Sequence, residues 1–81
     1  MKPRRLSLGN KNIIGRRVTE ARLSKGMKQI ELLTKLQLHG VDISSPALSL
    51  LEGQKRPVTD IELNALADIL NVSVDWLLGR S

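Results

Sequence analysis

The sequence contains no cysteine, phenylalanine or tyrosine, and Trp76 is its one aromatic residue. Without cysteine, neither a disulfide framework nor a thiolate metal site is available. A protein that binds single strands by stacking needs several aromatic side chains, so that class is disfavoured. No apolar run approaches the roughly 20 residues that span a bilayer, and the basic start lacks the apolar run of a signal peptide. We therefore expect a cytoplasmic protein without membrane association.

Residues that carry catalysis are also scarce. His39 stands beside Gly40 with no cluster of ligand-type residues nearby, and the chain has no glycine-rich phosphate-binding loop. The acids Asp60, Glu62 and Asp68 have the spacing of an ordinary exposed helix surface. We expect no enzymatic activity, no cofactor and no metal.

Charge is distributed unevenly along the 81 residues. Residues 1–28 hold nine of the thirteen Lys and Arg and one acid, which gives +8, whereas residues 29–81 hold four bases and seven acids, which gives −3. This asymmetry indicates a polyanionic partner for one side of a single small domain. We expect a flexible basic arm over residues 1–10, either contacting DNA or without a role, and a folded domain over residues 11–81.

Local signals predict an all-α chain without strands. The expected helices are residues 13–25, 28–36, 45–52, 59–70 and 74–78. Asn12 is a candidate N-cap, Gly26 suits a left-handed helix stop, and residues 59–62 form a capping box. Asn71 closes the fourth helix and Ser73 caps the fifth.

Apolar spacing predicts which side chains face the core. Ile30, Leu33 and Leu36 share one face of the second helix. We expect the apolar residues of the connection 37–44 to be buried, and this group is Leu38, Val41 and Ile43. In the third helix, Leu48 and Leu51 should face inward. The outward group should be Ser45, Ala47, Ser49 and Leu50.

Residues 28–56 contain two helices joined by a turn, with basic residues on either side. Ser44 or Ser45 can cap the second of these helices, and Pro46 fits its first turn, where a missing N–H is no loss. In the first turn of the preceding helix, Lys28, Gln29 and free backbone amides would bind a phosphate. This is the outline of a helix-turn-helix that binds DNA.

Over residues 13–79 the chain resembles the Xre-type helix-turn-helix domain of lambdoid phage repressors and Cro proteins. Four segments carry the resemblance: GMKQ at 26–29, LSLLE at 48–52, RP at 56–57 and NVSVDWLL at 71–78. The resemblance implies a compact five-helix, lambda-repressor-like domain that binds operator DNA as a two-fold dimer.

The resemblance also implies residue roles. Gln29 would hold a phosphate and support a base-contacting side chain, while Arg22 and Glu52 would form a structural pair. Lys55 and Arg56 would lie along the DNA backbone. The recognition-helix positions near base edges would be Ser44, Ser45, Pro46, Ala47, Ser49 and Leu50.

Three features depart from the pattern of this family. The connection 37–44 is longer than the usual turn by about five residues, and the loop glycine appears one place early, as Gly53. The third helix also lacks the Arg, Asn or Gln that form bidentate contacts with bases. Ala47 or Leu50 could contact a thymine methyl, and specificity would otherwise depend on DNA shape, waters or the arm.

Two hypotheses of different classes follow. In the first, the chain is a DNA-binding transcriptional regulator, a homodimer on a palindromic operator, acting as a Cro or controller protein or as one domain of a longer repressor. In the second, it is a protein-interaction module or antitoxin that retains the helix-turn-helix shape and binds a protein partner through its apolar third helix. For the regulator, the candidate dimer surface is the cluster Val74, Trp76, Leu77 and Leu78, in which core packing fits Trp76 and Leu77 better and Leu78 is the better interface residue.

Overall fold

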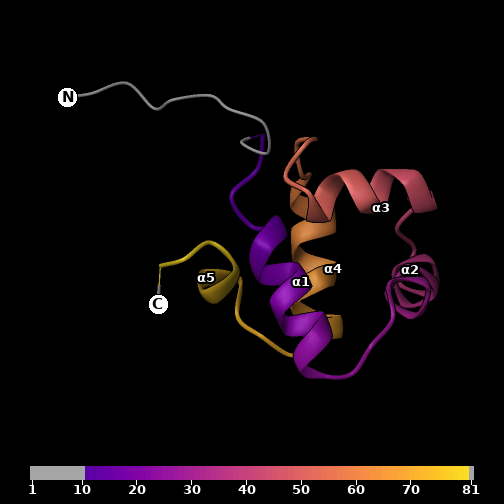
Figure 1. Ribbon diagram of the computed structural model, residues 1–81, viewed down its shortest axis with the longest axis horizontal. Coiled ribbons are helices and arrows are strands. Elements are labelled where there is room, and N and C mark those ends of the chain that lie inside the picture. Colours follow the sequence, from indigo (N-terminus) through magenta and orange to yellow (C-terminus); the bar gives the residue numbers. More distant parts are fainter. Residues whose placement is uncertain (1–10, 81) are drawn as a thin grey trace.

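The computed structural model describes residues 11–80, and these residues fold into five helices without a strand. The helices are α1 (Gly15–Ser24), α2 (Gln29–Leu38), α3 (Ser45–Glu52), α4 (Asp60–Leu70) and α5 (Val74–Leu77) (Figure 1). The all-α prediction is therefore confirmed for this part of the chain, with helix ends shifted by one or two residues. The expected basic arm, residues 1–10, lies outside the described residues.

Capping residues set several of the helix ends, as the sequence indicated. The N-cap of α1 is Ile14, which makes no side-chain cap bond, and not the predicted Asn12. Asn12 lies two residues earlier, and its side-chain oxygen accepts hydrogen bonds from the backbone amides of Ile14 and Gly15, at 3.1 and 2.7 Å. Gly26 follows α1 with a φ of +66°. Thr59 and Glu62 form the capping box of α4, and Asn71 ends that helix in the left-handed conformation. These are local interactions, which explains why a sequence pattern could predict them.

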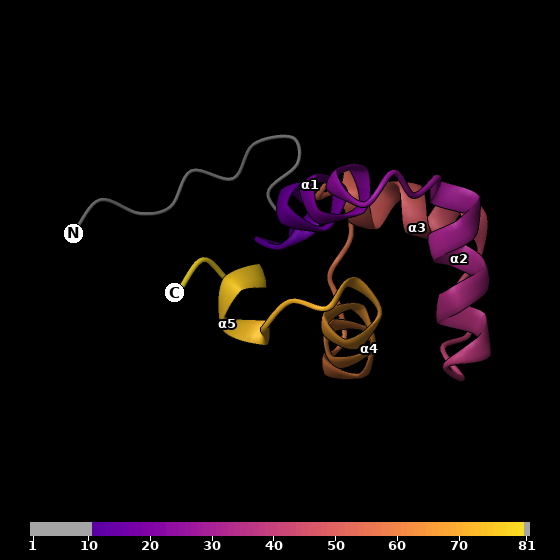
Figure 2. The same ribbon diagram turned by 90° about the horizontal axis from the view of Figure 1, so that it is seen from below.

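The helices pack in crossed orientations around one core. In Figure 1 α2 is viewed along its axis while α3 crosses the upper edge of the domain, and in Figure 2 α2 lies across the direction of α3. Helix α4 contacts α1, α2 and α5. Helix α3 therefore lies at the periphery, fixed to α1 and α2 along one side.

Eight side chains fill the centre of the core with less than 2 % exposure: Leu32, Leu36, Leu48, Leu51, Leu66, Leu70, Leu77 and Val18. The predicted inward positions Leu48 and Leu51 are confirmed. Val41 and Ile43 are buried in the connection before α3, again as predicted. This connection is therefore anchored to the core at two points, although it is longer than a simple turn.

Two expectations about α2 are wrong. Leu38 was expected in the core, but it is 82 % exposed. Ile30 was placed on the face of Leu33 and Leu36, but it is 59 % exposed, and Leu32 takes the buried position. Both faces of α2 carry apolar residues, so the side that packs against α4 decides which of them are buried.

Helix α5 joins the domain through Leu77 and through a contact with α1. Leu77 is fully buried, whereas Trp76 and Leu78 are half-buried against the core. The Arg17 guanidinium lies over the Trp76 ring, 4.9 Å from its centroid, which is within cation–π range. Within residues 11–80, no helix is both long and apolar enough to cross a membrane.

A glycine allows α1 and α3 to approach closely. A Cβ at Gly15 would overlap the carbonyl oxygen of Leu51 and lie 2.9 Å from that of Glu52. Both atoms belong to the backbone at the end of α3, so they cannot rotate away as a side chain would. The position of α3 on α1 therefore depends on a residue without a side chain.

We expect Gly15→Ala to destabilise the protein by about 1–3 kcal/mol, because overpacking against backbone outweighs the gain in helix propensity. Urea unfolding monitored by circular dichroism measures this change. Glu20→Ala, on the exposed side of α1, is the matched control and should shift stability by less than about 0.5 kcal/mol. A Gly15→Ala protein as stable as the control would contradict the close approach.

Candidate nucleic-acid interface

Helix α3 presents most of its predicted contact residues to solvent. Ser44, Ser45, Pro46, Ser49 and Leu50 are exposed, and Ala47 is half-buried. The intervening Leu48 and Leu51 anchor the opposite side of the helix in the core. Sequence reasoning thus separated the two faces of α3 correctly.

The first turn of α3 is held by its cap. The Ser44 hydroxyl oxygen accepts a hydrogen bond from the Ala47 amide at 3.3 Å, and Pro46 occupies the first turn. The cap fixes the direction in which the exposed residues Ser45 and Pro46 project. It also engages the Ser44 hydroxyl within the protein.

A hydrogen-bonded ion pair fastens α3 to α1. The Arg22 Nε donates to Glu52 Oε2 at 2.9 Å, and Nη2 donates to Oε1 at 3.1 Å. These side chains are only 12 % and 7 % exposed. Arg22 Nη1 also donates to the Met27 carbonyl at 2.9 Å, and the Thr19 hydroxyl donates to Glu52 at 3.1 Å. The predicted partners are therefore together, and they also hold the turn before α2.

Gln29 extends this network to α2. Its Nε2 donates to Glu52 Oε1 at 3.2 Å, while its Oε1 accepts from the Ser49 hydroxyl at 3.0 Å. The side chain thus bridges the beginning of α2 to two successive turns of α3. Sequence reasoning identified Gln29 as important but did not identify this bridge to Ser49.

The start of α2 carries the features expected of an anion site. Lys28 is exposed, and no hydrogen bond among residues 11–80 engages the backbone amides of Gln29 and Ile30. Amides at a helix start favour an anion such as phosphate. Glu31 accepts from the Lys28 amide at 3.0 Å, so its carboxylate is engaged at the N-cap of the helix. The Lys28 side chain and the amides of Gln29 and Ile30 therefore remain available to bind an anion.

The loop after α3 separates the two predicted cations. Lys55 is exposed, whereas Arg56 Nη1 and Nη2 donate to the two carboxylate oxygens of Glu62 at 3.1 and 2.9 Å. Sequence reasoning missed this pair, although a capping-box glutamate six residues from an arginine was its signal. The Arg56 charge is therefore paired within the fold, whereas the Lys55 charge is accessible to an external anion.

The loop glycine, Gly53, stands one place before the position that the family resemblance implies, and the residue at that position has a left-handed backbone conformation. The left-handed residue after α3 is Gln54, with a φ of 63°, whereas Gly53 has an ordinary φ. The Gln54 side chain donates to the Asn12 carbonyl at 3.1 Å, and its own carbonyl accepts from the Lys11 amide at 2.9 Å. The Asn12 side chain in turn donates to Leu51 and Arg56 carbonyls. These bonds offset the unfavourable backbone conformation.

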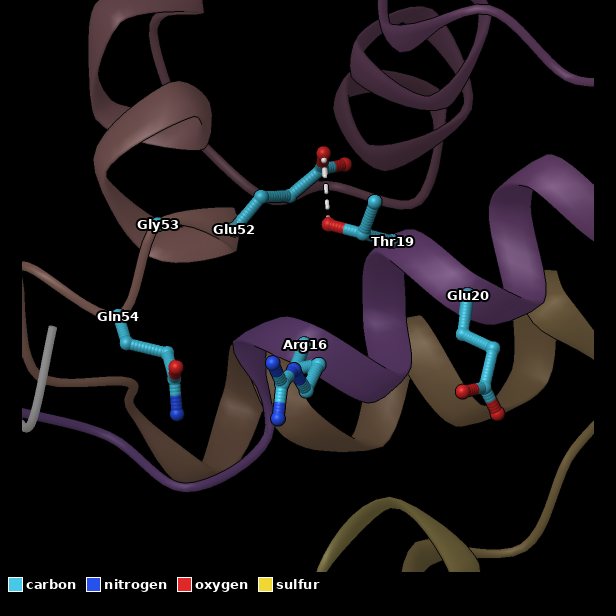
Figure 3. A pocket seen from close by; sticks show the side chains of 6 residues that line it. All are labelled: Arg16, Thr19, Glu20, Glu52, Gly53 and Gln54. Carbon is cyan, nitrogen blue, oxygen red and sulfur yellow. Dashed lines mark hydrogen bonds between the residues drawn. The ribbon is translucent and has the colours of Figure 1, made fainter.

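A groove of about 530 Å³ lies between α1 and the end of α3 (Figure 3). Its lining is Arg16, Thr19, Glu20, Glu52, Gly53 and Gln54. Two of these residues are acids, and the Glu52 carboxylate is already engaged by Thr19, as the dashed line in Figure 3 marks. Arg22 and Gln29 also donate to this carboxylate, so its oxygens are held by contacts within the fold.

Glu62 is a buried carboxylate whose ionised form is stabilised. Burial acts to raise the pKa of Glu62, but the hydrogen bonds and charge of Arg56 and the hydrogen bonds of Thr59 outweigh burial and lower the pKa. A carboxyl whose pKa is lowered by folding stabilises the folded state at pH values above its ordinary, unfolded-state pKa of about 4.3. That contribution is lost as pH falls through the folded-state value.

We expect Glu62→Gln to destabilise the protein at pH 7 by about 1–3 kcal/mol, because Arg56 loses its charged partner. The difference from wild type should shrink as pH falls below about 4.3. Thermal unfolding between pH 7 and pH 3 measures it. Glu20→Gln is the control, and a pH-independent effect of Glu62→Gln would contradict the assignment.

We expect Arg22→Ala and Glu52→Ala each to lower the free energy of unfolding by about 3–5 kcal/mol, because each leaves one buried charge unpaired. The double variant should be less destabilised than the sum of the two. Chemical denaturation of all four proteins measures the coupling. Additive effects would mean that the pair contributes no mutual stabilisation.

No family model matches the chain, and no curated protein or solved structure matches it. Among the described residues, α2, α3 and their flanking loops form the candidate interface. The centre of this interface is the network of Gln29, Ser49 and Glu52. Around it lie the exposed side of α3, the available amides of α2 and the exposed lysines Lys28 and Lys55.

Proposed function

We propose that the chain is a sequence-specific DNA-binding transcriptional regulator. In this proposal the domain has the lambda-repressor-like arrangement, α2 and α3 form a helix-turn-helix, and α3 enters the major groove. The observation that carries the proposal is the Gln29 bridge, because it fixes an exposed helix face beside the available amides of α2. Rigid presentation of a helix beside a phosphate site is what major-groove binding requires.

The phosphate contacts in this proposal come from both sides of α3. Lys28 and the amides of Gln29 and Ile30 would bind one phosphate, and Lys55 would lie along the DNA backbone after α3. Arg56 retains a role in this loop chiefly through its pair with Glu62, which orders the backbone next to Lys55. The polyanionic partner is double-stranded DNA, which the positive net charge of the chain favours.

The regulator would act as a homodimer on a palindromic operator. Two recognition helices in such a dimer contact half-sites about 34 Å apart. The half-buried Leu78 lines an apolar cleft of about 420 Å³ together with Ile13 and Val58. An apolar surface of this kind is suited to a two-fold contact.

Selection of bound sequences from a random duplex pool tests the proposal. We expect an enriched palindrome, and affinity for it should fall with salt with a log–log slope of about −0.9 for each phosphate neutralised. Lys28→Ala and Lys55→Ala should each make this slope shallower, while Lys35→Ala, on the exposed part of α2 near its end, is the control. An unenriched pool and a salt-independent affinity would overturn the proposal.

A second candidate function, a protein-interaction module or antitoxin, is favoured by the exposed apolar residues of α2. Ile30 and Leu38 are 59 % and 82 % exposed, and both line a shallow cleft with Thr34 and Lys35. Exposed apolar patches are typical of protein-binding surfaces. Isolation of a stable protein partner whose binding is lost in Leu38→Asp, together with no DNA binding at low salt, would favour this candidate.

A further inference from the structure

The polar groups that α3 and its cap offer for contacts with bases are single hydroxyls. The Ser44 hydroxyl oxygen accepts from the Ala47 amide and retains its proton as a donor, and the Ser49 hydroxyl donates to Gln29 and retains its oxygen as an acceptor. Glu52, at the end of the helix, is engaged by Arg22. Ser45 carries the one α3 hydroxyl without a hydrogen bond among the described residues, and a single hydroxyl contacts several bases without distinguishing them.

Beside these hydroxyls, α3 carries a group of three apolar side chains. Pro46 and Leu50 are four residues apart, and Ala47 and Leu50 are three apart, so all three share one side of the helix. Pro46 is exposed, Leu50 is 45 % exposed, and Ala47 packs partly against the core. We name this group the methyl-contact surface.

Two exposed lysines come close to the methyl-contact surface. The Lys55 amide donates to the Leu50 carbonyl at 2.8 Å, which brings the backbone of the exposed Lys55 to this part of α3. Gln29 bonds to Ser49, and the exposed Lys28 directly precedes Gln29. An apolar surface with lysines near it complements a DNA groove, whose floor carries methyl groups between two phosphate backbones.

We infer that α3 recognises the C5-methyl group of pyrimidines in the major groove and binds thymine and 5-methylcytosine alike. The inference rests on the proposed function and names the chemical group that the same site recognises. Thymine and 5-methylcytosine carry the methyl group at the same position but differ in the neighbouring atom, which is an acceptor in thymine and a donor in cytosine. Pro46, Ala47 and Leu50 contact the methyl group and cannot distinguish an acceptor from a donor.

The test uses the duplex enriched by selection with the full-length protein. At each thymine of a half-site, four duplexes are compared, carrying thymine–adenine, 5-methylcytosine–guanine, uracil–adenine or cytosine–guanine. At one or more positions, we expect thymine and 5-methylcytosine to bind within about twofold of each other. Uracil and cytosine should bind about fourfold more weakly, the effect of about 0.8 kcal/mol for one buried methyl-sized group.

Leu50→Ala should reduce the preference for the methyl group, while unfolding measurements check that this exposed substitution leaves the fold intact. Leu38→Ala, an equally conservative change on exposed α2, is the control and should retain the preference. Equal binding of uracil and thymine at every position would overturn the inference. It would also be overturned if, at every position that prefers thymine to uracil, thymine bound well above 5-methylcytosine. Either result leaves DNA binding itself in place, whereas a pool without enrichment would overturn both proposals.

Discussion

The carboxylate of Glu52 is the point at which three helices meet. It accepts hydrogen bonds from Thr19 and Arg22 of α1 and from Gln29 of α2, while its own backbone ends α3. A buried charge is costly unless it is paired and fully hydrogen-bonded, and here four donor atoms meet that requirement. The orientation of α3 is therefore set by directional bonds as well as by the non-directional packing of Leu48 and Leu51.

The same network limits the chemistry that the exposed side of α3 can offer. The Gln29 side chain donates to Glu52 and accepts from the Ser49 hydroxyl, so both of its polar atoms have partners within the fold. The Ser49 hydroxyl uses its proton on Gln29 and retains only its oxygen as an acceptor. The exposed polar groups of α3 and its cap are single serine hydroxyls, so specificity in the proposed complex depends on methyl contacts and DNA shape.

Local signals in the sequence predicted the helices and their ends well. They predicted poorly the features that depend on distant residues, such as the side of α2 that is buried. The caps at Thr59, Asn71 and Ser73 act within a few residues of the helix ends they define, so their patterns are sufficient. The side of α2 that is buried depends on packing against α4, and the periodicity of α2 fits both Ile30 and Leu32. In the candidate site, the Arg22–Glu52 contact followed from a resemblance, whereas the Arg56–Glu62 pair required a chain path that the sequence does not reveal.

In the proposed complex with DNA, positive charge and base recognition come from different parts of the domain. Residues 11–81 hold ten Lys and Arg and eight acids, so they contribute +2 of the net +5, and Lys2, Arg4 and Arg5 supply the remaining +3. Three of those ten bases, Arg17, Arg22 and Arg56, are engaged in contacts within the fold. In this proposal, attraction to DNA would depend on the other seven cations, which are lysines together with Arg16 and Arg80, and on the charges of residues 1–10, whereas discrimination would depend on α3, which carries no cation. Because these two contributions come from separate residues, non-specific affinity and selectivity can change independently.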